Sequence, residues 1–220
     1  MVPFSFAGED MALVHGRALH WPREKALLVA DLHLEKASSY AIGGQMLPPY
    51  DSRETLERIA LAIRESGARR VICLGDSFHD HGGQARLEPH AAGMLAALTR
   101  AVDWVWIAGN HDAGGDGARD ELEVGGVVLR HRPAPGEARP EISGHFHPRL
   151  AVTARGRRIA RHCAVASESR MILPAFGALA GGMDAADPAI LAALQPARTI
   201  DALLPAGGRI VHYPLWRAAA

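Results

Sequence analysis

Apolar residues in the first half of the chain fall into short continuous runs separated by longer periodic stretches. The continuous runs have the length of strands and occupy residues 26–30, 70–75 and 103–109. The periodic stretches have the length of helices and occupy residues 51–67 and 87–101. This β-α-β-α-β order predicts largely parallel strands joined by helices, which is the pattern of an α/β fold.

The stretch 51–67 also carries signals for both ends of a helix. Its apolar residues recur at the helical period, at Leu56, Ile59, Ala60 and Ile63. We expect Asp51 to cap the amino end and Glu54 to complete a capping box. Gly67 is expected to end the helix.

The second half of the chain has a different pattern. Short β-like runs with turn residues between them occupy residues 125–131, 140–145, 149–167 and 170–176. A turn at Arg155-Gly156 predicts a hairpin, and the runs together suggest a second sheet. The remaining expected elements are a hairpin over 11–22 that turns at Gly16-Arg17, a short helix over 187–194 capped by Asp187, and a strand over 207–214.

Length and composition place broad limits on the protein. The 220 residues suit a single domain spanning 1–220, and the formal net charge of zero argues against a wholesale basic surface that would coat nucleic acid. Cys73 and Cys163 are too few for a disulfide framework, which fits a reducing, cytoplasmic setting. The first residues lack the pattern of a signal peptide, and no apolar stretch is long enough to cross a membrane, so we expect no membrane partner.

Polar residues of one chemical kind follow each predicted strand. They are Asp31 and His33, Asp76 and His79, Asn110 and His111, His131, and His145 and His147. Because the carboxyl ends of parallel strands lie along one edge of a sheet, we expect those of the first half to meet in one crevice. Carboxylate, imidazole and amide oxygen are ligands for divalent metals such as Mn²⁺, Zn²⁺ or Fe²⁺. The set contains no cysteine, so a closed structural zinc site is not expected.

Each motif taken alone has a simpler interpretation. Asp-Leu-His at 31–33 and Gly-Asn-His-Asp at 109–112 are typical of solvated loops and turns. Together they require a common explanation, because successive strand ends carry metal-ligating chemistry. Alternation along a strand would project Asp31 and His33 to one side while Leu32 enters the core.

Five motifs in this order resemble those of the calcineurin-like metallophosphoesterases: DLH at 31–33, GDSFH at 75–79, GNHD at 109–112, His131, and GHFH at 144–147. The resemblance implies an α/β/β/α sandwich, in which two packed mixed sheets are flanked by helices and a two-metal site lies at one edge. The stretches DLHLEKASSYAIGGQMLPPYDSRETL and LPAFGALAGGMD are similar to those of the PdeM family, the bacterial ligase-associated DNA damage response endonucleases.

The resemblance also implies a set of metal ligands. One metal would be held by Asp31, His33 and His147, a second by Asn110, His131 and His145, and Asp76 would bridge the two. His131 is preferred to His162 because it ends a strand-like run between the GNHD and GHFH motifs. Two divalent ions are implied, with Mn²⁺ expected first and Zn²⁺, Fe²⁺ or Mg²⁺ as alternatives.

The GDSFH motif departs from the usual GDxxD motif of the family, because His79 occupies its last position. This form resembles the nuclease subunit of the double-strand-break repair complex, in which the histidine faces DNA. The resemblance favours a role for His79 on the substrate side and argues against Asp80 as a ligand.

We expect two metals ~3.5–4 Å apart to hold a bridging hydroxide that attacks phosphorus in line. His111 would stabilise the transition state or protonate the leaving oxygen, and Asp112 would either orient His111 or form a turn. The expected catalytic residues are therefore Asp76, His79, Asn110 and His111.

The resemblance points to DNA as the substrate, and to a DNA ligase and a helicase of the same repair system as partners. Arginines near the last motifs could neutralise DNA phosphates if they line the cleft, although a solvated charged loop is the better explanation for any single one of them: Arg130, Arg132, Arg139 and Arg149. The alternatives are a small-molecule phosphodiesterase or phosphatase and, more distantly, a scaffold without catalysis. The Gly-rich stretch 177–184 lacks a P-loop lysine, so we expect a backbone crossing near the site there, not a nucleotide site.

Overall fold

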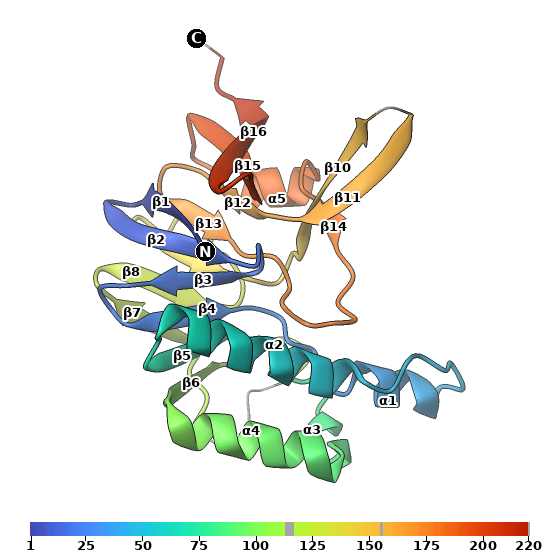
Figure 1. Ribbon diagram of the computed structural model, residues 1–220. Coiled ribbons are helices and arrows are strands. Elements are labelled where there is room, and N and C mark those ends of the chain that lie inside the picture. The colour runs from blue at the N-terminus through green and yellow to red at the C-terminus, as the bar shows by residue number, and fades with distance from the viewer. Residues whose placement is uncertain (113–116, 155, 220) are drawn as a thin grey trace.

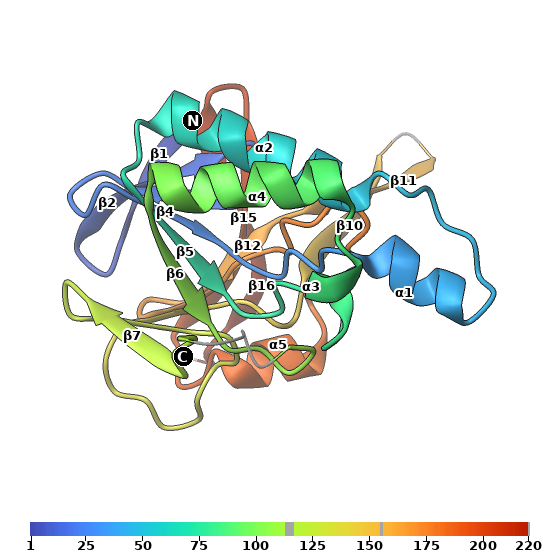
Figure 2. The same cartoon turned by 90° about the horizontal axis from the view of Figure 1, so that it is seen from below.

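Two large β-sheets pack face to face at the centre of the protein, and helices cover their outer faces (Figure 1). Seen from below, α2 and α4 lie on one side of the sheets and α5 on the other (Figure 2). This computed structural model describes residues 1–112, 117–154 and 156–219.

The first sheet has six strands in the order β1-β2-β3-β4-β5-β6. Its strands are β1 (Val2–Phe6), β2 (Glu9–Val14), β3 (Ala18–Trp21), β4 (Ala26–Val29), β5 (Arg70–Leu74) and β6 (Asp103–Ile107). The first four are antiparallel neighbours, whereas β4, β5 and β6 are parallel, as predicted from the β-α-β-α-β order. The connections between the parallel strands carry α1 (Lys36–Ile42), α2 (Asp51–Ser66), α3 (Gly83–Arg86) and α4 (Pro89–Ala101).

The second large sheet has seven strands in the order β16-β15-β12-β13-β9-β8-β7. These are β7 (Glu121–Val124), β8 (Val127–Arg130), β9 (Glu141–Ser143), β12 (Ala164–Ala166), β13 (Arg170–Ile172), β15 (Thr199–Ala206) and β16 (Arg209–Arg217). Parallel pairs β8–β9 and β9–β13 lie beside antiparallel neighbours, so this sheet is also mixed. A third sheet joins β10 (Pro148–Ala154), β11 (Arg157–His162) and β14 (Met183–Asp184), and α5 (Pro188–Ala193) follows it.

The hydrophobic core forms three layers that match this arrangement. Between the two large sheets, residues such as Leu28 and Ile72 of the first sheet pack in one cluster with Leu129 and Ile142 of the second. A second cluster joins the first sheet to α2 and α4, and a third joins the second sheet to α5. The predicted α/β/β/α sandwich is therefore confirmed.

The ends of α2 differ from the prediction at one terminus. Gly67 ends the helix in the left-handed conformation, with φ of 67°, as expected. Asp51 does not cap it: the N-cap is Tyr50, and the Asp51 carboxylate accepts a hydrogen bond from Ala37 N of α1 at 3.1 Å. Glu54 pairs with Arg58 one turn later, so the capping box is also wrong. The local pattern could not show that the start of α2 packs against the first turn of α1.

The other predicted boundaries are closer to the structure. Asp187 caps α5 by accepting from Ala189 N at 2.9 Å, as expected. The helix expected over 87–101 begins at Pro89, because Glu88 is its N-cap and accepts from His90 N and Ala91 N. The hairpin over 11–22 forms as β2 and β3.

The run 149–167 divides between two sheets. β10 and β11 form the predicted hairpin, whereas β12 joins the seven-stranded sheet after Cys163. Arg155 of the expected turn lies outside the described residues, while Gly156 has a φ of 72°. Both cysteines are buried free thiols.

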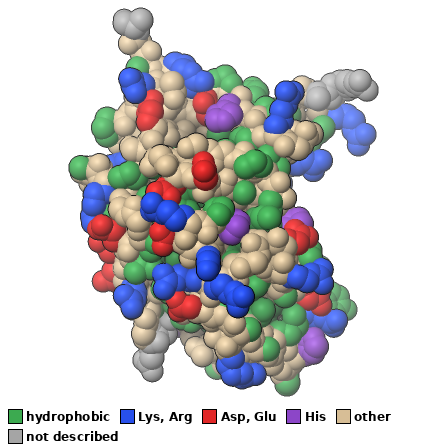
Figure 3. Space-filling model, turned by 60° about the vertical axis from the view of Figure 1, so that its left-hand side comes forward, with side chains coloured by type: hydrophobic (Ala, Val, Ile, Leu, Met, Phe, Trp, Pro, Cys, Tyr) green, Lys and Arg blue, Asp and Glu red, His purple; other side chains and the backbone are tan. Residues whose placement is uncertain are grey.

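The structure also bears on the expectations about surface charge and membrane-spanning segments. Basic and acidic side chains are interspersed on the face shown in Figure 3, in keeping with a net charge of zero. Within the described part of the chain, no helix combines the length and the apolar character needed to cross a membrane.

Candidate metal centre

The chain segments that follow the central strands meet at one edge where the two large sheets adjoin. Asp31 N donates to Gly75 O at 3.2 Å, and His33 N donates to Asp76 O at 2.9 Å, so the segments after β4 and β5 run side by side. From the second sheet, His145 N donates to both oxygens of Asp31, at 3.2 and 3.0 Å. The sheet order thus brings residues more than a hundred positions apart into contact.

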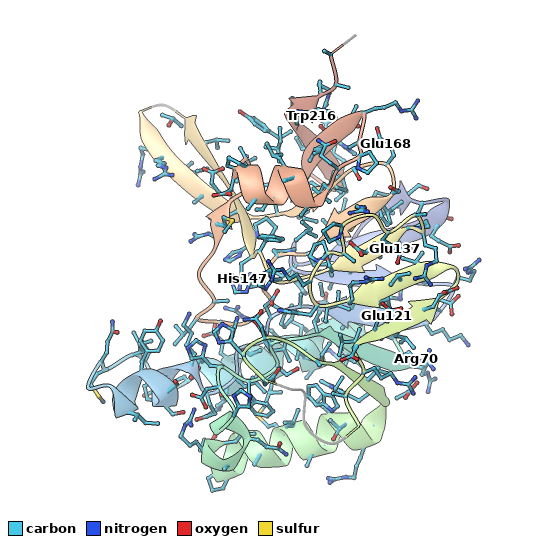
Figure 4. All side chains as sticks on the ribbon, turned by 180° about the vertical axis from the view of Figure 1, so that it is seen from behind. Arg70, Glu121, Glu137, His147, Glu168 and Trp216 are labelled. Atoms are coloured by element: carbon cyan, nitrogen blue, oxygen red, sulfur yellow. The ribbon has the colours of Figure 1, made fainter. Side chains whose placement is uncertain are left out.

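His147 marks this edge in Figure 4, at the base of the β10–β11 hairpin. Arg70 lies at the start of β5 and is labelled at the other end of the six-stranded sheet, away from His147. The polar residues therefore gather at the carboxyl ends of the strands, where open α/β sheets bind ligands.

The backbone at the site is unusual for residues with side chains. Asp31, His33, Asp76, His145 and His147 all have positive φ, between 44° and 73°. Non-glycine residues seldom adopt this region, and such residues concentrate at functional sites. The expected strand-like alternation at 31–33 is therefore wrong in its geometry. Its consequence holds, since Leu32 is buried in the core while its two neighbours face the site.

A first group consists of Asp31, His33 and His147. Their ligand atoms lie within 4.8 Å of one another. His147 Nε2 is 3.4 Å from Asp31 Oδ1 and 3.3 Å from His33 Nε2. One carboxylate and two imidazoles at these separations could hold a divalent metal.

A second group consists of Asn110, His131 and His145. His131 Nε2 lies 2.8 Å from Asn110 Oδ1 and 3.2 Å from His145 Nδ1. His131 is buried, which agrees with the preference for it over His162, whose side chain lines a different cavity.

Asp76 lies between the two groups and is almost fully buried. Its Oδ2 is 3.8 Å from His33 Nε2 and 3.5 Å from His131 Nε2. Its Oδ1 accepts a hydrogen bond from His111 N at 2.9 Å, which fixes the orientation of the carboxylate. A carboxylate in this position can serve both groups at once.

The donor set itself shows that a cation fits here. His131 Nδ1 lies 2.9 Å from Leu74 O, and because a carbonyl only accepts, this nitrogen carries the proton. In the neutral form of the ring, Nε2 is then unprotonated and faces the acceptor oxygens of Asn110 and Asp76, and a metal ion would satisfy this arrangement of lone pairs. Histidine ligands usually donate their second ring nitrogen to a carbonyl in this way.

Burial lowers the pKa of two of the ligand imidazoles, His33 and His145, which favours the neutral form that a metal ligand needs. The pKa of His33 is lowered to about 2, first by desolvation and then by His147, His111 and His79. The pKa of His145 is also lowered, by desolvation and by His131. Neutral rings leave nitrogen lone pairs free at neutral pH.

His79 and His111 form a stacked pair beside His33. Their ring centroids are 5.2 Å apart, and His79 Nδ1 is 3.4 Å from His33 Nδ1. His111 Nδ1 lies 2.9 Å from His79 O, so this ring nitrogen carries the proton and Nε2 is left free.

Two aspartates near this pair do not join the site. Asp112 was expected either to orient His111 or to form a turn. The orienting role is wrong, because the His79 carbonyl holds the ring and Asp112 Oδ2 accepts from Phe78 N at 2.6 Å. Asp80 pairs with Arg86 at 2.7 Å, and this hydrogen bond lowers the pKa of Asp80 to about 2.

Two residues of α1 that the motif pattern did not single out border the same pair. The Tyr40 ring lies 5.5 Å from the His79 ring, and Lys36 Nζ lies 5.6 Å from the Tyr40 ring. Desolvation lowers the pKa of Lys36. A cation and an aromatic ring follow the DLH motif at helical spacing, and that spacing is the signal that could have identified them.

Two of the four arginines considered for phosphate binding are already paired. Arg130 contacts three carboxylates, at 2.8 to 3.2 Å: Glu121, Glu137 and Glu141. Arg139 is held by Glu137 and Glu123. The assignment of these two to phosphate is therefore corrected, whereas Arg132 and Arg149 line cavities beside the site.

Glycines allow the backbones to approach at the site, and Gly109 gives a direct test. A Cβ on Gly109 would lie 2.1 Å from Asp76 Oδ1 and 2.2 Å from Asp76 N. Gly109→Ala should therefore displace Asp76 and reduce the amount of bound metal. Phosphodiesterase activity should fall by at least about ten-fold, because displacing a catalytic group by ~1 Å can lower the rate by ~10²-fold. Metal analysis and kinetics measure this, with Gly93→Ala on α4, where a Cβ meets nothing within 4 Å, as the control. Full metal content and activity in Gly109→Ala would contradict the packing argument.

The Gly-rich stretch 177–184 also passes the site closely, as expected. A Cβ on Gly177 would lie 2.1 Å from the carbonyl oxygen of Leu32, the residue between Asp31 and His33. A Cβ on Gly182 would lie 2.6 Å from His147 O.

Comparison with known proteins identifies the family of the chain. The chain is similar in structure to a nuclease, MPE, from Pseudomonas putida, with 29% identity, a TM-score of 0.71, and 97% of this chain and 98% of that chain covered. It is also similar to Yfce, a phosphoesterase from E. coli, with 15% identity, a TM-score of 0.42, and 84% and 96% covered. No curated protein sequence matches the chain. Residues 25–152, more than half of the chain, match the family described as Calcineurin-like phosphoesterase, and the chain belongs to this family.

Proposed function

We propose that the protein is a two-metal phosphodiesterase that hydrolyses DNA. The observation that carries the proposal is the convergence of two groups of ligand atoms on the two sides of one buried carboxylate, Asp76. The calcineurin-like phosphoesterase family implies divalent metal ions, and the donor set fits them. A non-catalytic scaffold would have no need for so many clustered ligands.

In this proposal Asp31, His33 and His147 hold one metal, and Asn110, His131 and His145 hold the other. Asp76 balances the charge of both. Bound divalent ions would polarise phosphoryl oxygens and lower the pKa of water towards ~7. Manganese is the metal we propose first, because the oxygen ligands of Asp31, Asp76 and Asn110 suit it, and zinc and iron, which imidazoles suit, are the alternatives.

His111 is proposed to act on the leaving oxygen, with its Nε2 free and its Nδ1 held by the His79 carbonyl. His79 would then serve as a platform that keeps the His111 ring in place beside the substrate. Asn110 would contribute both as a ligand and by fixing the loop before His111.

Replacing His111 with glutamine should lower phosphodiesterase kcat by about 10²–10⁴-fold, the usual contribution of a positioned acid or base. Because the metal-binding groups are retained, metal content should stay the same. Steady-state kinetics and metal analysis measure the two effects. His90→Gln on the exposed face of α4 is the matched control. Retention of full activity by His111→Gln would exclude this role.

DNA is proposed as the substrate because the chain is similar over nearly its whole length to a protein described as a nuclease. The motif resemblance to ligase-associated endonucleases supports the same choice and suggests a DNA ligase and a helicase as partners. We further propose that the 220 residues act as one domain in the cytoplasm, where buried free cysteines stay reduced.

The deciding experiment incubates metal-loaded protein with supercoiled plasmid, linear DNA and bis-p-nitrophenyl phosphate. A DNA nuclease should nick the plasmid, and its activity on DNA should fall steeply with salt. Hydrolysis of the small diester without nicking of plasmid would favour a small-molecule phosphodiesterase of the same family. No hydrolysis of any substrate with any divalent metal would refute the enzymatic proposal.

A further inference from the structure

Three adjoining cavities lie next to the metal centre, two of them along one face of the β10–β11 hairpin. The largest, about 580 Å³, is lined by Arg149 and His162 of the hairpin and by His15 and Arg17 of the β2–β3 turn. It shares His15 and Arg17 with a cavity of about 300 Å³ that reaches Arg58 of α2. It shares Arg149 with a third, of about 290 Å³, that reaches Arg158 near the hairpin tip. We call these three cavities the basic groove.

Strand register explains why this face is both hollow and basic. Arg149 pairs with His162, Ala151 with Ala160, and Thr153 with Arg158. Because side chains alternate along a strand, these three pairs lie on the same face of the hairpin. The two alanines form a shallow floor, and a cation stands at each end. The hairpin projects on the same side of the molecule as α1, in both Figure 1 and Figure 2.

Several cations of the groove have no matching carboxylate. Among the described residues, Arg149 and Arg158 make no ion pair, and Arg149 Nε is buried without a hydrogen-bond partner. Arg17 donates to the neutral carbonyls of Phe176 and Gly177, at 3.4 and 3.1 Å. Its pKa is lowered by desolvation and then by Arg58 and Arg149, which shows that like charges crowd here.

Some acidic groups do border the groove. Glu54 pairs with Arg58, Glu65 pairs with His15 at 2.8 Å, and Asp184 lines the third cavity. Arg17, Arg149 and Arg158 remain in excess, so the groove carries net positive charge. Partly buried positive charge without a partner is costly, and a bound anion removes that cost.

The basic groove adjoins the metal centre at Arg149 and Gly182. Arg149 lies on β10 two residues after His147, and Gly182 packs against both, since its Cβ would lie 2.3 Å from Arg149 Cδ and 2.6 Å from His147 O. On the other side of the centre, a cavity of about 410 Å³ mixes acidic and basic residues: Asp120, Glu121, Arg130 and Arg132. A polyanion that reaches the metals is therefore favoured on the side of the hairpin.

We propose that the basic groove binds the sugar-phosphate backbone of the DNA strand next to the scissile phosphate, with Arg149 and Arg158 contacting successive phosphates. The inference rests on the proposed function, because it places the scissile phosphate at the metal centre. The groove makes the enzyme select a strand over a mononucleotide, because only a strand can place one phosphate at the metal centre and further phosphates in the groove. It reads no base sequence, because phosphate contacts carry none.

Binding tests the groove separately from catalysis. Fluorescence anisotropy of a labelled single-stranded oligonucleotide is measured on metal-loaded protein in the His111→Gln background, in which cleavage of the probe is slow. Arg149→Gln and Arg158→Gln should each weaken binding by about three- to ten-fold and reduce the slope of log K against log salt by about 0.7–1. The exposed Arg158 side chain can be changed without disturbing the core, so loss of folding does not confuse its result.

Arg100→Gln at the end of α4 removes an equivalent exposed charge away from the groove and should leave binding unchanged. In activity assays, the ratio of kcat/KM for the oligonucleotide to that for bis-p-nitrophenyl phosphate should fall in both groove variants. Unchanged affinity and salt slope in the Arg149→Gln/Arg158→Gln double variant would overturn the proposal. Equal competition by a free mononucleotide would overturn it as well. DNA cleavage that persists with unchanged binding in the groove variants would reject the groove and keep the proposed function. Weakened binding in a protein that hydrolyses no substrate would support the groove and reject the proposed function.

Discussion

Asp76→Asn should abolish phosphodiester hydrolysis, with a loss of kcat of about 10³-fold or more. The substitution keeps an oxygen that can accept the His111 N–H bond, so the local fold is preserved. It removes a buried charge that faces both His33 and His131. Losing the charge shared by two dications removes several kcal/mol of transition-state stabilisation, and each ~1.36 kcal/mol is a factor of ten in rate.

Kinetics on bis-p-nitrophenyl phosphate and metal analysis of the same samples measure this effect. Bound metal should fall together with activity, because Asp76 is proposed to contact both ions. The matched control is Asp103→Asn at the amino end of β6, which removes an exposed carboxylate that pairs with Arg70 at 2.5 Å, away from the metal centre. An Asp76→Asn protein with normal activity and two metals per chain would show that this carboxylate is not the bridge.

Removal of metal by EDTA should eliminate activity and also destabilise the fold. Asp31 and Asp76 are buried carboxylates in one ligand cluster, so their charges need a cation between them. A ligand present at a hundred times its Kd stabilises the folded state by about 2.7 kcal/mol. At this chain length that corresponds to a fall in Tm of about 5–10 °C when the metal is removed.

Thermal unfolding with and without EDTA measures the shift, and separate addition of Mn²⁺, Zn²⁺, Fe²⁺ or Mg²⁺ shows which ion restores turnover. Asp76→Asn serves as the internal control, because its Tm should respond much less to EDTA. Undiminished activity of protein shown to be free of metal would reject the two-metal proposal.

The order of apolar runs was enough to predict much of the fold. Buried strands at 26–30, 70–75 and 103–109 and the helices between them follow from local periodicity, because burial repeats every two residues in strands and every 3.6 in helices. The second sheet was only suggested, since its short strands pair across long intervals. β12, for example, leaves the hairpin run and pairs with β13 and β15.

The residues of the candidate site were predicted from the sequence, but their setting was not. Each motif placed one or two metal-ligating side chains at a strand end, and the structure brings all of the predicted ligands together. The left-handed backbone at Asp31 and Asp76 depends on hydrogen bonds from neighbouring segments. The contact by which the His79 carbonyl, and not Asp112, orients the His111 ring also comes from a neighbouring segment. Local patterns carry no information about such contacts.

The charges around the site show the same division. By itself the sequence determined which side chains are chemically able to hold metal and that they follow strands, because residue type and local period are local properties. Only the tertiary structure decided that Arg130 and Arg139 are paired with glutamates while Arg17 and Arg149 line one groove. The physical reason is that a charge acts through what surrounds it, and its surroundings come from distant parts of the chain, as when His147 meets His33 across 114 residues.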